Sequence, residues 1–128
     1  MINPYDKGAK FERNIANKFS SWFGKLCGAK FKRVGMAESQ KITALGDFMC
    51  VKFSCPYREG CPLSTTFWEL CNRDRIAWER KFEKALDDRQ HKRTAILIGK
   101  TTNKPIRVML DFNYFLELLY ELLELKNH

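Results

Sequence analysis

Two carboxylates stand in apolar, strand-like segments where acidic side chains are unusual. Asp47 lies at the start of the segment 46–53, and Glu69 lies in the middle of the segment Thr65–Cys71. Asp is among the residues that strands disfavour, and an unpaired carboxylate in apolar surroundings either raises its pKa or needs a cation. Because both carboxylates lie on segments that can neighbour each other in a sheet, they indicate one shared cation. Ligands that are all oxygen favour a hard ion, Mg²⁺ or Mn²⁺, over zinc.

A third carboxylate, Glu12, lies beside the apolar stripe of a predicted helix, at a place from which it could point toward the sheet. A purely structural interpretation is also open. Asp47 would then cap a turn after Gly46, and Glu69 would pair with Arg73 or Arg75. Each residue alone allows this interpretation, but the joint pattern favours the metal site.

The elements that must position these side chains follow from the hydrophobic periodicity of the chain. Apolar residues at helical spacing predict helices over Ala9–Phe23, Asp74–His91 and Asp111–Lys126, with Gly24 ending the first and Asn72 or Asp74 capping the second. Strands are predicted over 30–34, 46–53, 65–71, 94–98 and 105–110, and a loop over 54–64. The order α-β-β-β-α-β-β-α predicts an α/β fold in which some strands run parallel. Without a repeat or a Pro/Gly-rich linker, residues 1–128 are expected to form a single domain.

The net charge of +8 is unevenly distributed along the chain. Residues 111–128 carry four acids and one Lys, which is a net charge of −3 and leaves +11 on the remainder. Basic residues spread through the body of a domain suit binding to nucleic acid, because each phosphate contact releases counterions. A merely soluble basic surface is the alternative. The candidate DNA-binding residues are Lys30, Lys32, Arg33, Arg75, Lys81 and Lys84.

The sequence gives little support to a membrane protein or to a zinc site formed by cysteines. No apolar run approaches the roughly 20 residues that span a bilayer, and the N-terminus lacks a signal-peptide core, so an intracellular, cytoplasmic protein is expected. The five cysteines are then expected to be reduced. A zinc site is the alternative for four of them, although their spacing matches no common zinc pattern. These four are Cys50, Cys55, Cys61 and Cys71.

The predicted C-terminal helix is apolar over more than one stripe. Part of its surface should therefore be covered by something other than the sheet of its own domain. A homodimer through this acidic, leucine-rich helix is the corresponding hypothesis. A protein-interaction module that uses the same helix is a further alternative for the function.

The order of short motifs along residues 8–120 resembles that of the PD-(D/E)XK nuclease superfamily. The motifs are GAKFERNIA, RVG, GDF, FWELCN, RIAWERKFEKAL and TAILIGKTTNKPIRVML, and the chain is most similar to the small Holliday-junction-resolvase-like endonucleases that phages encode. This resemblance implies a restriction-endonuclease-like core, with a central mixed β-sheet of about five strands flanked by helices. It also implies a metal-dependent DNA endonuclease that hydrolyses phosphodiester bonds in duplex or branched DNA and that works in the host cytoplasm if a phage encodes it. Asp47 and Glu69 would hold Mg²⁺ or Mn²⁺, with support from Glu12.

The chain departs from the family's pattern at one position. The family has a lysine two residues after the strand glutamate, and this chain has Cys71. Positions 69 and 71 share one face of a strand, about 6.5 Å apart, so Cys71 should face the site. Arg73, Lys81 or Lys52 could supply the missing cation, although Lys52 has the wrong parity relative to Asp47 unless a bulge intervenes. Otherwise the site is weak or inactive and the fold binds DNA, or the cysteine is an introduced substitution, or the metal chemistry is changed.

Overall fold

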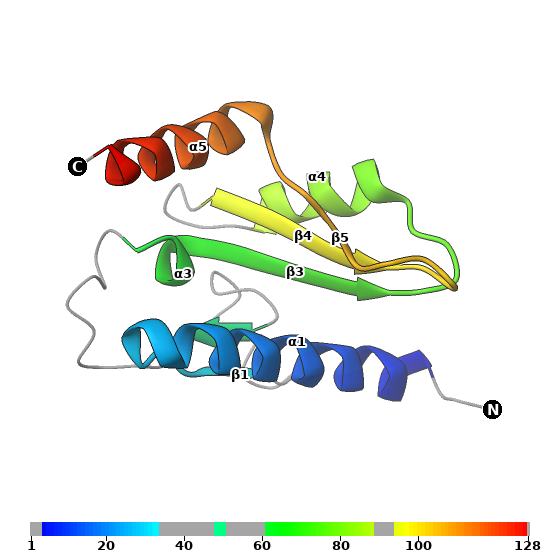
Figure 1. The fold of residues 1–128 in the computed structure, drawn as a ribbon. Helices are drawn as coiled ribbons and strands as arrows, with labels where there is room; N and C mark the ends of the chain where they lie inside the picture. Colours follow the sequence, from blue (N-terminus) through cyan, green and yellow to red (C-terminus); the bar gives the residue numbers. More distant parts are fainter. Residues whose placement is uncertain (1–3, 34–47, 51–60, 89–93, 128) are drawn as a thin grey trace.

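The computed structural model describes residues 4–33, 48–50, 61–88 and 94–127 (Figure 1). The helices are α1 (Pro4–Cys27), α3 (Pro62–Thr65), α4 (Trp78–Asp88) and α5 (Phe112–Lys126). The strands are β1 (Phe31–Arg33), β2 (Phe48–Cys50), β3 (Thr66–Asn72), β4 (Thr94–Lys100) and β5 (Arg107–Met109). The α/β class predicted from the sequence is confirmed.

The described strands form two sheets. In the larger sheet the order is β3-β4-β5, with β3 and β4 parallel from Thr66↔Thr94 to Asn72↔Lys100 and β5 antiparallel to β4. The parallel pair needs a crossover connection, which contains α4. The smaller sheet is the antiparallel pair of β1 and β2. The larger sheet is therefore mixed, as expected from a chain in which strands and helices alternate.

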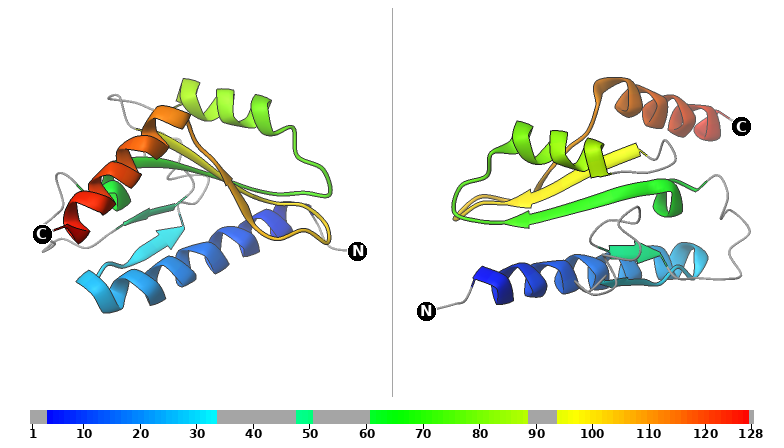
Figure 2. Two further views of the ribbon diagram at one scale, coloured as in Figure 1. Left: turned by 45° about the horizontal axis from the view of Figure 1, so that its top comes forward. Right: turned by 180° about the vertical axis from the view of Figure 1, so that it is seen from behind.

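The larger sheet lies between helices on its two faces. Figure 2 shows α4 on one face, with α1 and the β1–β2 pair on the other. The core is divided accordingly, because successive side chains of β3 point to opposite faces. Trp68 and Leu70 belong to the cluster on the α1 side, whereas Phe67 and Cys71 belong to the cluster that contains Phe82 of α4.

The first helix is longer than its apolar periodicity predicts. It extends from Pro4 to Cys27, and Gly24, the predicted end, lies within it. The helix ends before Gly28, which has a positive φ of 72° and whose N–H donates to the carbonyl of Gly24 at 2.9 Å. Glycine adopts this left-handed conformation without the steric cost that a side chain adds. The prediction placed the end of the helix at the wrong one of two glycines.

The start of α4 also differs from the prediction. The helix begins at Trp78, so neither Asn72 nor Asp74 is its N-cap. Instead, the carboxylate of Asp74 accepts hydrogen bonds from Thr102 Oγ1 at 2.6 Å and from Lys7 Nζ at 3.5 Å. These two bonds, the Thr102 bond foremost, lower the pKa of Asp74. Asp74 thus ties the β3–α4 connection to the β4–β5 turn and to α1.

Two further elements complete the described fold. A loop is predicted over 54–64, but its described end, from Pro62, belongs to the single-turn helix α3. This helix begins with a proline at its first position. Helix α5 contains no buried residue, and the hydroxyl group of Tyr114 lies 3.5 Å from that of Thr66. Among the described residues, no helix is long and apolar enough to cross a membrane.

Candidate functional site

Glu69 is the buried carboxylate around which the candidate site is built. It lies in the middle of β3, opposite Leu97 of β4, and the residue is only 9% exposed. Because Phe67 and Cys71 belong to the cluster on the α4 side, alternation places Glu69 on that same face. The sequence-based prediction of a carboxylate inside an apolar strand is confirmed.

Burial controls the electrostatics of Glu69. Removal from water raises the pKa of its carboxyl group above the ordinary value of 4.5. The positive charges of Lys81 and Lys84 on α4 lower this pKa, whereas the negative charges of Asp88 and Glu12 raise it. The combined result is a raised pKa, because the two lysines offset only part of the cost of burying the ionised carboxylate of Glu69.

Glu12 extends the site to α1. Its Oε1 atom accepts a hydrogen bond of 2.8 Å from Arg33 Nε, within an ion pair that joins α1 to β1. Burial nevertheless raises the pKa of Glu12, against the opposing effects of Arg33 and Arg13. In this structure Arg33, predicted as a phosphate contact, therefore neutralises a candidate metal ligand.

The structure describes two of the three predicted carboxylates, Glu69 on the α4 face of β3 and Glu12 on α1, the helix that covers the other face. The negative charge of Glu12 is the smallest of the effects that shift the pKa of Glu69. Asp47 and Lys52 lie outside the described residues, and among the residues that are described no three His, Cys, Asp or Glu side chains form a metal-binding group. The oxygen-only chemistry of the two carboxylates, each disfavoured as a bare anion by burial, fits a hard divalent cation.

Cys71, at the position where the resemblance to PD-(D/E)XK nucleases predicts a lysine, belongs to the packed core. It shares the face of Glu69, as predicted, but it is only 5% exposed and packs in the apolar cluster with Phe67 and Phe82. Its partner across the parallel ladder is Gly99. A lysine at this position would have to place its ammonium group among apolar side chains.

The three candidate replacement cations have different positions. Arg73 follows β3, is exposed, and its backbone N–H donates to the carbonyl of Lys100 at 3.1 Å. Lys81 is half-buried on α4, and its charge exerts the largest attraction on Glu69. With Lys52 outside the described residues, Lys81 is the candidate that the described geometry favours.

Sequence reasoning did not identify two features of the site. The first is the Glu12–Arg33 pair, which depends on how β1 packs against α1. The second is Asp88, whose spacing from Lys81 and Lys84 places all three on one side of a helix, so helical periodicity could have revealed it. The described cysteines, Cys27, Cys61 and Cys71, are thiols. The zinc alternative also needs Cys50 and Cys55, whose side chains lie outside the described part of the structure.

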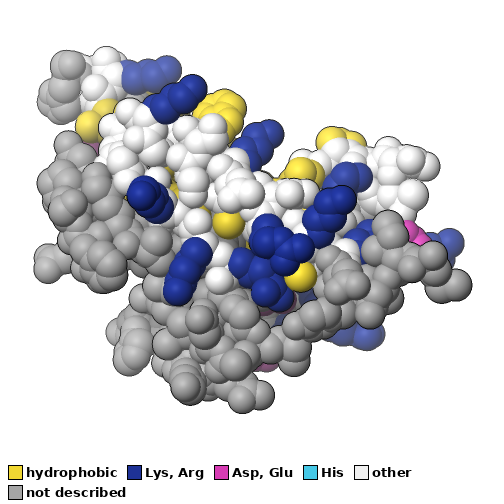
Figure 3. Space-filling view, turned by 90° about the horizontal axis from the view of Figure 1, so that it is seen from below, with side chains coloured by type: hydrophobic (Ala, Val, Ile, Leu, Met, Phe, Trp, Pro, Cys, Tyr) yellow, Lys and Arg dark blue, Asp and Glu magenta, His cyan; other side chains and the backbone are white. Residues whose placement is uncertain are grey.

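Basic side chains spread over the face that α1 forms. Figure 3 views the molecule from below Figure 1 and shows Lys and Arg side chains distributed across that face. On α1, Lys10, Lys18 and Lys25 are exposed and fall on one stripe of the helix. The exposed residues Lys30 and Lys32 follow it along the chain, while exposed Arg75 precedes α4 and exposed Lys84 lies on α4.

No protein family, curated protein or solved structure matches this chain.

Proposed function

We propose that this chain is a Mg²⁺- or Mn²⁺-dependent endonuclease that hydrolyses phosphodiester bonds in branched DNA. The observation that carries the proposal is the buried carboxylate of Glu69, whose pKa burial raises and the positive charges of Lys81 and Lys84 on α4 lower. Burying an ionised acid in an apolar sheet is costly unless the charge is paired, and buried acids with raised pKa values are candidates for functional sites. A cation held by Glu69, with Glu12 in support, would supply the missing pairing.

The core required by this function is the restriction-endonuclease-like one. In the proposal, the β1–β2 pair and the β3-β4-β5 sheet are parts of one mixed core of about five strands. Asp47 directly precedes β2 in the sequence and would be the third carboxylate of the site. Arg33 would exchange its bond with Glu12 for a phosphate group when DNA binds.

Each residue of the site would have a distinct role. Glu69, Glu12 and Asp47 would hold the metal, which when bound neutralises the phosphate and activates a water molecule for attack. Lys81 would offset negative charge that develops on the phosphate. In PD-(D/E)XK nucleases this is the role of the lysine that Cys71 replaces here. The exposed lysines of α1 would bind the DNA backbone without reading its sequence.

A cleavage assay tests the proposal. The parent is compared with Glu69→Gln, Glu12→Gln and Asp47→Asn on a four-way junction, a flap and a plain duplex, with Mg²⁺, Mn²⁺ or EDTA. We expect metal-dependent cleavage by the parent and a loss of at least about 100-fold in each variant, as for removal of an electrostatic catalytic group. Glu83→Gln, an exposed acid on α4, is the matched control and should cleave like the parent. Full activity of Glu69→Gln would refute the assigned site.

The packing of Cys71 favours a second candidate function, a nuclease fold that binds DNA but cuts weakly or not at all. Because Cys71 packs among apolar side chains where the resemblance predicts a lysine, the proposed site would have one cation fewer. This candidate predicts salt-sensitive DNA binding without metal-dependent cleavage by the parent. The two readouts together distinguish the candidates.

A further inference from the structure

Helix α5 exposes an apolar surface that is much wider than its contact with the rest of the chain. Its half-buried residues, Tyr114 and Leu118, lie on one line, and a stripe of acids formed by Glu117, Glu121 and Glu124 borders that line. Most of the remaining circumference is apolar and exposed. These exposed residues are Phe112, Phe115, Leu116, Leu119, Tyr120, Leu122, Leu123 and Leu125. Each of them is at least 40% exposed.

The size of this surface is that of an interface. At roughly 200 Å² for a fully exposed large apolar side chain, the eight residues together expose roughly 900 Å². The largest apolar patch of a typical monomer is about 300–600 Å². A stable protein–protein interface buries about 800 Å² on each partner. One partner of ordinary interface size would therefore cover the α5 surface.

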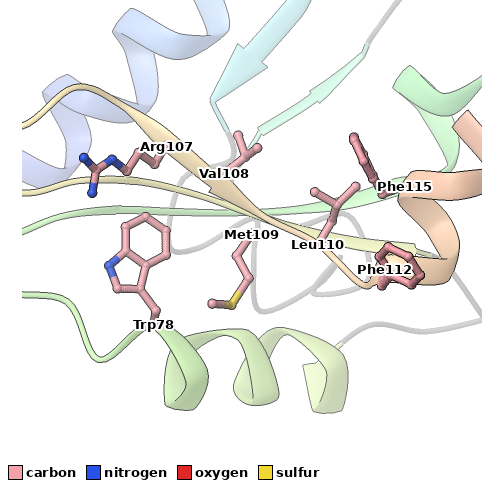
Figure 4. A pocket seen from close by; sticks show the side chains of 7 residues that line it. All are labelled: Trp78, Arg107, Val108, Met109, Leu110, Phe112 and Phe115. Carbon is pink, nitrogen blue, oxygen red and sulfur yellow. The ribbon is translucent and has the colours of Figure 1, made fainter. Parts of the chain in front are cut away.

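An apolar groove adjoins the same surface. It has a volume of about 570 Å³ and is lined by Trp78 at the start of α4, residues 107–110 along and after β5, and Phe112 and Phe115 of α5. Figure 4 shows these side chains along the three elements, with Arg107 at one end and Phe112 and Phe115 at the other. Because Phe112 and Phe115 belong to both, the groove and the exposed face of α5 form one continuous surface.

We propose that a second copy of this chain occupies this surface, in a two-fold dimer in which α5 of each copy packs against the groove and α5 of the other. The chain carries both halves of the interface: an apolar helix with a stripe of acids, and an apolar groove with Arg107 at its end. Residues 111–128 have a net charge of −3 and the remainder has +11, so α5 of one copy is attracted to the body of the other. An isologous arrangement uses both halves twice.

Sedimentation of the full chain tests the dimer. We expect the parent to be dimeric over about 1–100 µM, and Leu116→Glu or Leu123→Glu on α5 to weaken association by at least about 100-fold. Val108→Glu in the groove should weaken it similarly. Leu26→Glu, on the exposed side of α1 at 80% exposure, is the matched control and should stay dimeric. Circular dichroism confirms that each variant is folded, since all four residues are exposed.

A charge exchange tests the pairing of α5 with the groove. Arg107→Glu and the triple variant Glu117→Lys, Glu121→Lys, Glu124→Lys should each dimerise more weakly than the parent. An equimolar mixture of the two should associate at least about tenfold more tightly than either alone, because opposite charges then meet at both contacts. A monomeric parent, a dimer that survives the α5 variants, or a mixture no tighter than its components would overturn the proposal. The readout is mass, so the outcome is independent of nuclease activity.

Discussion

Glu69 is a residue whose burial makes folding less favourable at neutral pH. Its carboxyl group has a pKa raised above 4.5, chiefly because burial disfavours the charged form. Below this ordinary value the group is neutral in both the folded and the unfolded chain, so it has no effect on stability. As the pH rises from this ordinary value toward the raised pKa of the folded state, the unfolded state ionises first and the free energy of unfolding falls. The cost is complete once Glu69 is ionised in both states.

Removing this charge should therefore stabilise the metal-free protein. We expect Glu69→Gln to melt a few degrees above the parent at pH 7, and the difference to disappear near pH 4. Calorimetric melting curves in EDTA across this pH range measure both values. Glu83→Gln, which removes an exposed acid from α4, should show no comparable gain. A lower melting temperature of Glu69→Gln at pH 7 would mean that Lys81 and Lys84 overcompensate the burial.

Introducing at position 71 the lysine that the resemblance to PD-(D/E)XK nucleases predicts should be costly in this fold. Cys71 is 5% exposed among apolar side chains, so Cys71→Lys buries an ammonium group or forces the cluster to open. We expect the free energy of unfolding to fall by about 3 kcal/mol or more, against about 1 kcal/mol for Cys71→Ala. Urea denaturation measures the two changes. Equal losses for both variants would show that the lysine reaches Glu69 without disturbing the packing.

Individual residues of the site were predictable to different degrees. Glu69 was evident from the sequence because an acid within an apolar strand has few explanations. The face of Cys71 was also predictable, since strand alternation fixes it. Its burial depends on where α4 crosses the sheet, and the pairing of Glu12 with Arg33 depends on how β1 packs, so neither follows from local spacing.

At the scale of elements, periodicity located every described strand and long helix but not all of their ends. The period of apolar residues reflects burial, whereas helix ends depend on local hydrogen bonds and backbone conformation. Thus Gly28, rather than Gly24, takes the left-handed conformation that ends α1. Asp74 resembles a helix cap in sequence, but its hydrogen bonds go to Thr102 and Lys7, which only the tertiary structure brings near it.

The contact between α4 and β4 depends on a glycine. A Cβ atom at Gly99 would lie 2.6 Å from Cη2 of Trp78 and 2.9 Å from Cδ1 of Ile76. We expect Gly99→Ala to lower the free energy of unfolding by about 1–3 kcal/mol, because the indole ring of Trp78 must shift. Urea denaturation monitored by circular dichroism measures the stability.

A second glycine provides the control for this prediction. Gly8 lies within α1, and a Cβ atom there would meet nothing within 4 Å. Gly8→Ala should therefore raise the free energy of unfolding by about 0.5–1 kcal/mol, through its higher helix propensity. If both alanine variants had the same effect, the close approach of Trp78 to β4 would not be the cause.

For the molecule as a whole, charge and apolar surface are segregated. The acidic residues of α5 accompany the exposed apolar surface, while the lysines of α1 lie on the face seen in Figure 3. The uneven charge was predictable from the sequence, but its arrangement on separate faces depends on how the helices surround the sheet. A protein that dimerises through α5 would keep the face of α1 open to a polyanion.

The face of α1 should consequently carry the salt dependence of DNA binding. We expect Lys10→Gln and Lys18→Gln each to reduce the slope of log K against log salt by about 1, because each removes one phosphate contact and its released counterions. Fluorescence anisotropy with a labelled duplex in EDTA, which prevents cleavage, measures the slope from low to moderate salt. Lys126→Gln removes the same charge from acidic α5 and should leave the slope unchanged. If all three variants changed the slope equally, net charge rather than the face of α1 would govern binding, because only a localised contact distinguishes lysines of equal charge.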